Sequence, residues 1–388
     1  MLTGEATTTR VPAAAMHALA GSDLLVLAKP GGVHEDGLPG LRPIGMPEAL
    51  RKLAASALAA TVRSSAADLL SPGQLGVGVP NACESILHEL GAHPAHHPGD
   101  TVVQRDFANA FNLVSRLAAE AVLHSALPVL TRYLRWAYRG GGPCVFGWAV
   151  DAAAPPPPPG ADGSVPPAQP ADGSSPPPPR WCLRAERGAQ QRDPLGPLLH
   201  PAAMWLVLER LRADHPSVVV RTFQDDVVVM GPPAALRGVI DAAARLGKGV
   251  DAQLAPQKCV GWFPAGAAAQ PGRPAQWTTK GLTQFSVPVG GAAFVAAAVD
   301  GLATAQVALF AAVGVMPSEH LHVQLLMLRF CAGPQANYWL RALPLADVAR
   351  MAGAVDRGAQ RVLADLRCDA RDDGATRAAV VERAASPL

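Results

Sequence analysis

Short runs of β-branched residues alternate with helix-spaced apolar residues through the middle of the chain. Residues 101–106 are predicted to form a strand that ends on a carboxylate. The apolar spacing then becomes that of one helix face, at Phe111, Val114, Ala118 and Val122. One helix is expected after a turn at 188–195 and another at about 234–246, and further strands are expected at 144–150, 181–183, 218–220, 227–229 and 258–263. This order indicates an α+β sheet close to the ferredoxin-like pattern.

Two adjacent aspartates, Asp225 and Asp226, lie between the predicted strands at 218–220 and 227–229. A short polar centre between β-branched runs predicts a hairpin with the carboxylates at or near its tip. At a separation of about 4 Å and an effective dielectric of about 20, two such charges repel by roughly 4 kcal/mol. A divalent cation between them would remove that cost, whereas a solvated turn that uses Asp for local hydrogen bonds needs no ligand. The pair alone leaves both interpretations open.

A third carboxylate, Asp106, lies where the predicted strand at 101–106 gives way to a helix. The predicted sheet allows Asp106 and the Asp225-Asp226 hairpin to lie on adjacent strands. Three carboxylates at that place would suit a two-metal phosphoryl-transfer site, because oxygen ligands suit Mg²⁺. We therefore expect two Mg²⁺ ions at Asp106, Asp225 and Asp226, with Mn²⁺ as a substitute.

The segments on either side of this sheet differ in character. Residues 1–100 are poorly periodic, and the elements expected there are a strand at 24–27, a loop at 29–32, a helix at 47–62, a strand at 74–79 and a short helix at 83–90. The C-terminal third is expected to be helical, with apolar stripes at Leu321, Leu325 and Leu328 and again at Val348, Met351, Val355, Ala359, Val362 and Leu366. Such stripes more often form a core than a site.

A proline-rich segment at 152–180 interrupts the pattern, with proline runs at 155–159 and 176–179. It cannot pack a core and is expected to be a polyproline-type or disordered loop. The residues at its ends, Val150 and Trp181, are strand-like, so the insertion is expected to connect a hairpin and not to separate domains. Partner docking and a solvated insertion without function are both compatible with it.

Composition indicates a globular protein, since 49% of the 388 residues are hydrophobic. The longest apolar run, 305–316, is too short to span a bilayer, and the N-terminus has no signal-peptide core. Six cysteines without a Cys-x-x-Cys pair fit reduced thiols, and a net charge of +2 neither demands nor forbids nucleic acid. We expect an intracellular protein without a membrane segment, and the sequence does not distinguish the nucleus from the cytoplasm.

Several blocks of the sequence, taken in order, resemble the motifs of reverse transcriptases of the kind encoded by non-LTR retrotransposons. Residues 188–197 resemble a palm motif of the Gly-x-x-Gln-Gly-Asp-Pro-Leu-Gly-Pro type, and Phe223-Gln224-Asp225-Asp226 matches the aromatic-x-Asp-Asp signature. The other blocks are Lys29-Pro30-Gly31-Gly32, Arg42-Pro43-Ile44, Gln74-Leu75-Gly76, Asp106-Phe107-Ala108-Asn109-Ala110-Phe111-Asn112, Pro256-Gln257-Lys258-Cys259, and Gly281-Leu282 with Val287-Pro288-Val289-Gly290. The resemblance covers nearly the whole chain.

This resemblance implies a polymerase right hand. The short fingers would be residues 1–100, the ferredoxin-like palm 101–292 with the 152–180 insertion, and the helical thumb 293–388. The implied activity is that of an RNA-directed DNA polymerase of a retroelement, which extends a DNA primer from its 3′-hydroxyl on an RNA template with deoxynucleoside triphosphates. No endonuclease or RNase H segment is recognised, so target cleavage and RNA removal are not expected of this chain.

The resemblance also implies roles for single residues. Asp106 and Asp225 would hold both metal ions with Asp226 in support, and Lys258 would protonate pyrophosphate as a general acid. Phe111 would lie beneath the sugar and exclude a 2′-hydroxyl. The remaining expected contacts are Lys29 and Arg42 at the triphosphate, Gln191 beside the incoming nucleotide, Gln74 along the template and Gly290 in the primer grip.

Departures from the family pattern, together with the proline-rich insertion at 152–180, leave an alternative open. Arg192 stands where the family usually has Gly, and its side chain could distort the turn or crowd the nucleotide. Ala255 replaces an Asn commonly seen before the Lys of its motif. The alternative is a catalytically inactive, polymerase-like remnant that still binds nucleic acid.

Two further functions are less well supported by the residues. An RNA-dependent RNA polymerase usually has a second Asp where Phe111 stands. A histidine metal site at His93, His96 and His97 is disfavoured because Pro94 and Pro98 are expected to break any helix that would align the rings.

Overall fold

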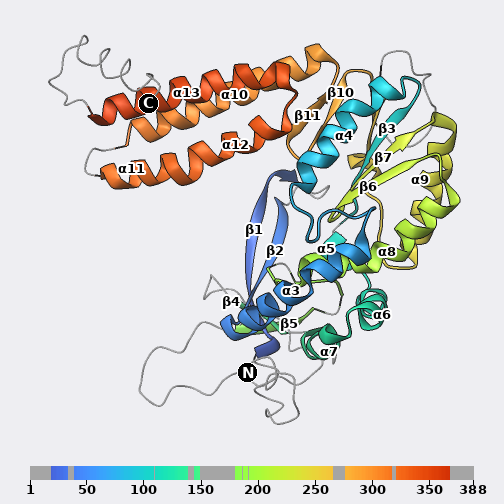
Figure 1. The fold of residues 1–388 in the computed structure, drawn as a ribbon. Coiled ribbons are helices and arrows are strands. Elements are labelled where there is room, and N and C mark those ends of the chain that lie inside the picture. Colours follow the sequence, from blue (N-terminus) through green and yellow to red (C-terminus); the bar gives the residue numbers. More distant parts are fainter. Residues whose placement is uncertain are drawn as a thin grey trace, which may run out of the picture. The chain divides into compact units, whose positions relative to one another are not determined.

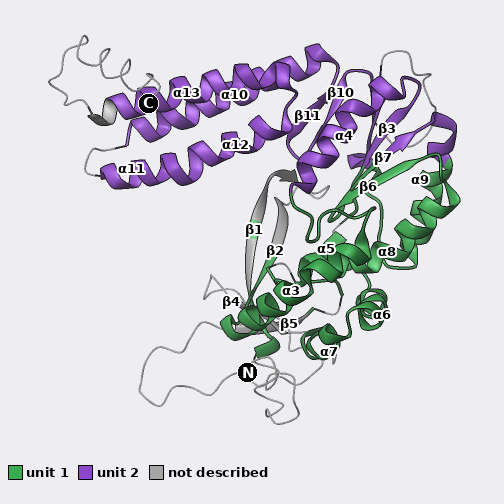
Figure 2. Ribbon diagram, in the orientation of Figure 1, with its two compact units in different colours: residues 1–80, 105–228, 238–256 green, residues 81–104, 229–237, 257–388 purple. Residues whose placement is uncertain are grey.

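The chain forms two compact units that interleave along the sequence (Figures 1 and 2). Unit 1 holds residues 1–80, 105–228 and 238–256, and unit 2 holds residues 81–104, 229–237 and 257–388. The computed structural model describes residues 19–33, 39–108, 110–138, 144–148, 180–185, 187–190, 192–264, 276–316 and 320–367. The division into fingers, palm and thumb stays a prediction.

Four strands of unit 1 form a sheet in the order β2-β1-β4-β5. They are β1 (Ser22–Val33), β2 (Pro39–Pro47), β4 (Cys144–Trp148) and β5 (Arg180–Arg184). Strands β4 and β5 are antiparallel, and Trp148 pairs with Arg180. The prediction that the proline-rich insertion connects a hairpin is therefore confirmed. Residues 149–179 of the insertion lie outside the described part of the chain.

A second sheet has five strands in the order β6-β7-β3-β8-β9. These are β3 (Thr101–Arg105), β6 (Val219–Phe223), β7 (Asp226–Gly231), β8 (Val260–Trp262) and β9 (Gln276–Thr278). Strand β7 is the neighbour of β3, so the expectation that Asp106 and the Asp225-Asp226 hairpin lie on adjacent strands is confirmed. The prediction of one ferredoxin-like sheet from residue 101 onward was wrong in one respect. The hairpin β4-β5 joins β1 instead, through a parallel pairing of Ser22 with Val145.

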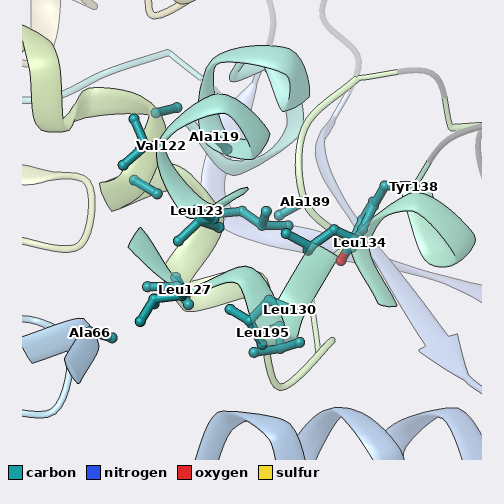
Figure 3. Packing of buried hydrophobic residues seen from close by; sticks show 14 of the residues in the cluster. Ala66, Ala119, Val122, Leu123, Leu127, Leu130, Leu134, Tyr138, Ala189 and Leu195 are labelled. Carbon is teal, nitrogen blue, oxygen red and sulfur yellow. The ribbon is translucent and has the colours of Figure 1, made fainter. Parts of the chain in front are cut away.

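The helices of unit 1 form its main apolar core. They include α3 (Ala49–Leu70), α5 (Ala110–Leu113), α6 (Arg116–Ala126), α7 (Thr131–Tyr138) and α8 (Gly196–Asp214), with the 3-10 turn η1 (Pro128–Leu130) between α6 and α7. Figure 3 shows part of this core, where apolar side chains of α6 and α7 meet Leu195 and Ala189. The helix expected from Phe111 onward is broken in two because Ser115 caps α6, accepting a hydrogen bond from the Ala118 N–H at 3.3 Å.

Helix α9 (Pro233–Lys248) follows β7, and its bounds agree with the predicted helix at about 234–246. The short helix η2 (Pro256–Lys258) then leads into β8.

Unit 2 is largely helical, as expected for the C-terminal third. Its elements include α4 (Ala82–His96), the hairpin β10 (Gly281–Gln284) and β11 (Val287–Gly290), α10 (Ala292–Gly314), α11 (Leu321–Met327), the π-helical turn η4 (Leu328–Ala332), α12 (Gly333–Ala342) and α13 (Leu345–Arg367). Helix α10 packs along α13, and Gly358 is needed there because a Cβ at that position would run into the Phe310 ring. The apolar stripe that ends at Leu366 thus forms core through Met351 and Val362.

Helix α10 is longer and more apolar than the 305–316 run indicated. By length and composition alone it could cross a membrane, with a mean hydropathy of 1.7 over its best window. It also buries Gln306, whose amide donates to the Ala332 carbonyl at 2.7 Å, and it carries Asp300 bound to Arg350 at 3.0 Å. A single helix of this kind is weak evidence for a membrane span, because core helices meet the same criterion.

Three local predictions in the first hundred residues were wrong. The loop expected at 29–32 lies within β1, where the register with β2 shifts between the pairs Ala28–Leu41 and Val33–Pro39. The strand expected at 74–79 is reduced to a single bridge between Gln74 and Thr222. Pro94 lies inside α4, which continues to His96.

Candidate active site

The two adjacent aspartates lie at a tight hairpin turn in unit 1. Strand β6 ends at Phe223 and β7 begins at Asp226, so Gln224 and Asp225 form a two-residue turn. Gln224 has a φ of 58°, as hairpin turns of the primed types require at their first central position. A side chain other than Gly in that conformation costs on the order of 1 kcal/mol, and such strain collects at functional sites. The surrounding chain must hold this turn in place.

Asp106 directly follows β3 and is half-buried, as are Asp225 and Asp226. Its backbone carbonyl accepts a hydrogen bond from the Ala255 N–H at 2.9 Å, and the Ala108 N–H donates to the Gln253 carbonyl at 2.8 Å. These bonds fix the point at which the chain leaves the strand.

Asp106 and the Asp225-Asp226 hairpin lie at the ends of the neighbouring strands β3 and β7, and the charges of Asp106 and Asp225 act on the pKa of Asp226. The pKa of Asp226 is raised from 3.8 to about 6. Burial contributes most to this increase, and the negative charges of Asp225 and Asp106 contribute the rest. Like charges raise a carboxyl pKa only at short range. The structure therefore brings together the three residues that the sequence singled out.

The donor chemistry of this group suits a hard divalent cation, because all three side chains offer carboxylate oxygens. Their side chains do not yet converge: among the described residues, no three His, Cys, Asp or Glu side chains are placed to hold an ion. The group fits a metal in composition and in backbone placement, and it would have to close around the ion.

Phe111 lies on α5 and is half-buried. Its ring packs against His200 of α8, with 5.4 Å between the ring centroids, and Phe107 contacts the same imidazole at 6.3 Å. His200 is 1% exposed, and neither ring nitrogen has a hydrogen-bond partner in the described part of the chain. Burial lowers the pKa of His200, and the Gln224 backbone raises it by a smaller amount. The resulting pKa is about 4, so the ring is neutral at pH 7. The lack of any hydrogen-bonded nitrogen indicates that the Gln224 contact is weak.

Sequence reasoning missed His200. Its only signal is a polar residue among apolar neighbours at the start of α8, where Leu198, Leu199, Ala202 and Ala203 are all buried.

The turn before α8 is anchored by a buried charge network that the sequence also did not reveal. Asp193 accepts hydrogen bonds from the Arg51 guanidinium at 2.8 Å, the Tyr138 hydroxyl at 2.6 Å and the Leu195 N–H at 2.9 Å. Both charged side chains are fully buried. Burial and the Asp193 charge raise the pKa of Tyr138 well above its usual value, so its hydroxyl remains a donor.

Arg192, one residue earlier, is exposed and has a φ of 71°. This is the left-handed conformation that Gly adopts without strain. Arg192 thus holds a backbone conformation that favours Gly, and it adds an exposed side chain to the turn. Gln191, expected beside the incoming nucleotide, lies outside the described residues.

Gln74 is buried in unit 1. Its side chain is 1% exposed, and its amide is hydrogen-bonded to the backbone of Gln224 and Gly76. The expected contact of this segment along the template stays a prediction.

The remaining predicted contact residues are spread over other elements. Lys29 and Arg42 lie on the antiparallel strands β1 and β2, where Arg42 pairs with Leu27, and their side chains fall outside the described part of the structure. Lys258 ends η2 and is exposed. Gly290 ends β11, and a Cβ there would collide with Gly281 of β10. The roles of these four residues stay predictions.

Comparison with known proteins gives no assignment from sequence. No protein-family model matches the chain, and no curated protein matches it significantly. Two solved structures share part of its fold at low similarity. The apo telomerase of Candida tropicalis aligns with a TM-score of 0.48 and 8% identity, covering 90% of this chain and 59% of that one. Telomerase of Candida albicans with a fragment of telomeric RNA aligns with a TM-score of 0.45 and 9% identity, covering 97% and 65%.

This chain thus spans less than two thirds of either telomerase chain. Telomerase is related to the reverse transcriptases, and the likeness concerns the fold alone. At these TM-scores it assigns neither an activity nor a partner, and it does not indicate a retrotransposon type.

Proposed function

We propose that this chain is an RNA-directed DNA polymerase, which adds deoxynucleotides to a primer 3′-hydroxyl on an RNA template. One observation carries the proposal: Asp106 and the Asp225-Asp226 hairpin come together on neighbouring strands, near enough to perturb the pKa of Asp226. A cluster of carboxylates that destabilises its own charge is what a divalent cation would stabilise. The order of motifs in the sequence supports the same chemistry.

Asp106, Asp225 and Asp226 would hold two Mg²⁺ ions, or Mn²⁺ in their place. When bound, the ions would activate the primer hydroxyl and neutralise the charge that develops on the leaving pyrophosphate. The contribution of the chain is to deliver three carboxylates from the ends of neighbouring strands of one sheet. Phe111, held against the buried His200, would lie beneath the sugar and exclude a 2′-hydroxyl.

The other contacts extend this proposal to the substrates. Lys29 and Arg42 would bind the triphosphate, Gln191 would border the nucleotide, Gly290 would lie along the primer, and Lys258 would protonate pyrophosphate. A retroelement origin and an intracellular location belong to the same proposal.

The test is primer extension on an RNA template with deoxynucleotides and Mg²⁺. Asp225→Ala should reduce extension at least about 10³-fold, because it removes a ligand of both ions. Asp241→Ala is the matched control, since Asp241 is an exposed aspartate on α9 of the same unit, and it should extend at the wild-type rate. Equal extension by wild type and Asp225→Ala would refute the proposal.

A catalytically inactive, polymerase-like protein is the second candidate. The observation that favours it is the lack of a ready-made ligand set among the described side chains. Primer-template binding that weakens with salt, without extension by the wild type under any metal, would support it, because phosphate contacts release counterions.

A further inference from the structure

The segment after α3 lies against the end of β6, in unit 1. The Leu75 N–H donates to the Thr222 carbonyl at 2.8 Å, and the Thr222 N–H donates to the Gly73 carbonyl at 2.8 Å. Gln74 and Thr222 form a parallel bridge between these bonds. A short stretch of chain, far from the hairpin in sequence, thereby pairs alongside the strand that leads into the Asp225 turn.

The Gln74 side chain continues this pairing around the turn. Its Oε1 accepts hydrogen bonds from the Gln224 N–H at 2.9 Å and from the Gly76 N–H at 2.8 Å. Its Nε2 donates to the Gln224 carbonyl at 2.9 Å. One amide thus satisfies both backbone polar groups of Gln224, the residue with the left-handed φ of 58°.

The contact is reciprocal and tightly packed. The side-chain Nε2 of Gln224 donates to the Gly76 carbonyl at 2.5 Å. A Cβ at Gly76 would lie 2.5 Å from the Gln224 backbone nitrogen, so only Gly allows this approach. Gln74 itself is 1% exposed, which removes water as a competitor for the same bonds.

We propose that Gln74 is a positioning residue for the carboxylate hairpin: its amide holds the Gln224 backbone in the conformation that presents Asp225 and Asp226 to a divalent cation. The inference rests on the proposed function. Gln224 directly precedes both aspartates, so its φ and ψ set where their Cα–Cβ bonds point. Ion binding then has a smaller entropic cost, because the turn already has the conformation that it needs in the bound state.

The main test replaces Gln74 by Met, which keeps the length of the side chain and removes its donor and acceptor. The Mg²⁺ concentration that gives half-maximal primer extension should rise about tenfold, as expected for the loss of the two hydrogen bonds that hold the Gln224 backbone. The KM for primer-template should stay within about twofold, because hydrogen bonds to Gln224 and Gly76 already occupy the buried Gln74 amide. Gln74→Glu should show a similar shift, since an ionised carboxylate still accepts from Gln224 N–H but cannot donate to its carbonyl.

Gln306→Met is the matched control, because Gln306 is equally buried and donates to one backbone carbonyl in unit 2. It should lose thermal stability without a change in metal dependence. If Gln74→Met lowers the melting temperature but leaves the half-saturating Mg²⁺ concentration unchanged, Gln74 is merely structural and the inference is overturned.

Two readouts do not need turnover. Hydrogen exchange at the Gln224 amide should accelerate at least about tenfold in Gln74→Met, while the Val229 amide within β7 keeps its wild-type rate. Mn²⁺ affinity measured by calorimetry should fall about tenfold in Gln74→Met and not in Gln306→Met. If the wild type does not extend primers but binds Mn²⁺ through Asp225, these affinities decide the inference although the polymerase proposal fails. If it binds no Mn²⁺, both proposals fall.

Discussion

The ionised side chain of Asp226 destabilises the folded protein. Its pKa is raised from 3.8 to about 6, by burial first and then by Asp225 and Asp106. Two pKa units correspond to about 3 kcal/mol, and partial exposure reduces this to about 1–2 kcal/mol. The folded state holds the proton more tightly than the unfolded state. Stability is therefore lost as the pH rises from about 4 to about 6, and the loss is complete at neutral pH.

We predict that Asp226→Asn stabilises the metal-free protein by about 1–2 kcal/mol at pH 7.5, because the neutral amide avoids the repulsion. Urea unfolding in the presence of a chelator measures it, and the gain should shrink as the pH falls through 6 towards 4. Asp241→Asn, on the exposed side of α9, should change stability by less than about 0.5 kcal/mol. A destabilised Asp226→Asn at pH 7.5 would show that the carboxylates do not repel one another.

His200 has the opposite pH dependence in an overlapping range. Its folded pKa of about 4 lies below the ordinary 6.5, so the unfolded chain takes up the proton first as the pH falls. Stability is therefore lost between about pH 6.5 and pH 4, by roughly 3 kcal/mol in total.

We predict that His200→Phe removes this acid sensitivity while keeping the ring contacts with Phe107 and Phe111. Unfolding free energies measured from pH 7 to pH 4 should fall by about 3 kcal/mol less in the variant than in the wild type. Parallel stability curves for the two proteins would mean that His200 is protonated as easily when folded as when unfolded. Protonation of Asp226 stabilises the folded protein as the pH falls, whereas protonation of His200 destabilises it. The two effects are separated by comparing the wild type with Asp226→Asn and with His200→Phe.

At the scale of elements, the Arg51–Asp193 network joins α3, α7 and the turn before α8. Arg51 comes from α3 and donates to Asp193 of the turn at 2.8 Å, and Tyr138 from α7 donates to the same carboxylate at 2.6 Å. The Arg51 guanidinium also lies 5.5 Å from the centroid of the Tyr138 ring. Removal of one partner leaves a buried charge without compensation, whereas removal of both does not.

We predict that Arg51→Met and Asp193→Leu each destabilise unit 1 by about 3–5 kcal/mol, and that the double variant loses far less than their sum. A double-mutant cycle by urea unfolding measures the coupling. The exposed i,i+4 pair Arg210–Asp214 on α8 is the control, with an expected coupling below about 0.5 kcal/mol. Additive losses at Arg51 and Asp193 would rule out the network as the anchor of the turn.

At the scale of the whole molecule, the order of elements was largely predictable, but their pairing was predictable only in part. Residues 144–148 and 180–184 are strands, as their composition indicates, yet they extend the sheet of β1 and β2. A hydrophobic pattern identifies a strand but not its neighbour, because an edge strand offers the same backbone hydrogen bonds to any partner that reaches it. The interleaving of the two units along the chain has the same origin.

The sequence by itself determined the hairpin at Asp225, the carboxylate at the end of β3 and the helical C-terminal third. These features follow from local spacing, turn chemistry and the residue types that strands and helices prefer. Only the tertiary structure decided that Gln74 bonds to Gln224, 150 residues further along the chain, and that Arg51 and His200 are buried. Such contacts depend on which surfaces meet when the core forms, and no local pattern encodes them.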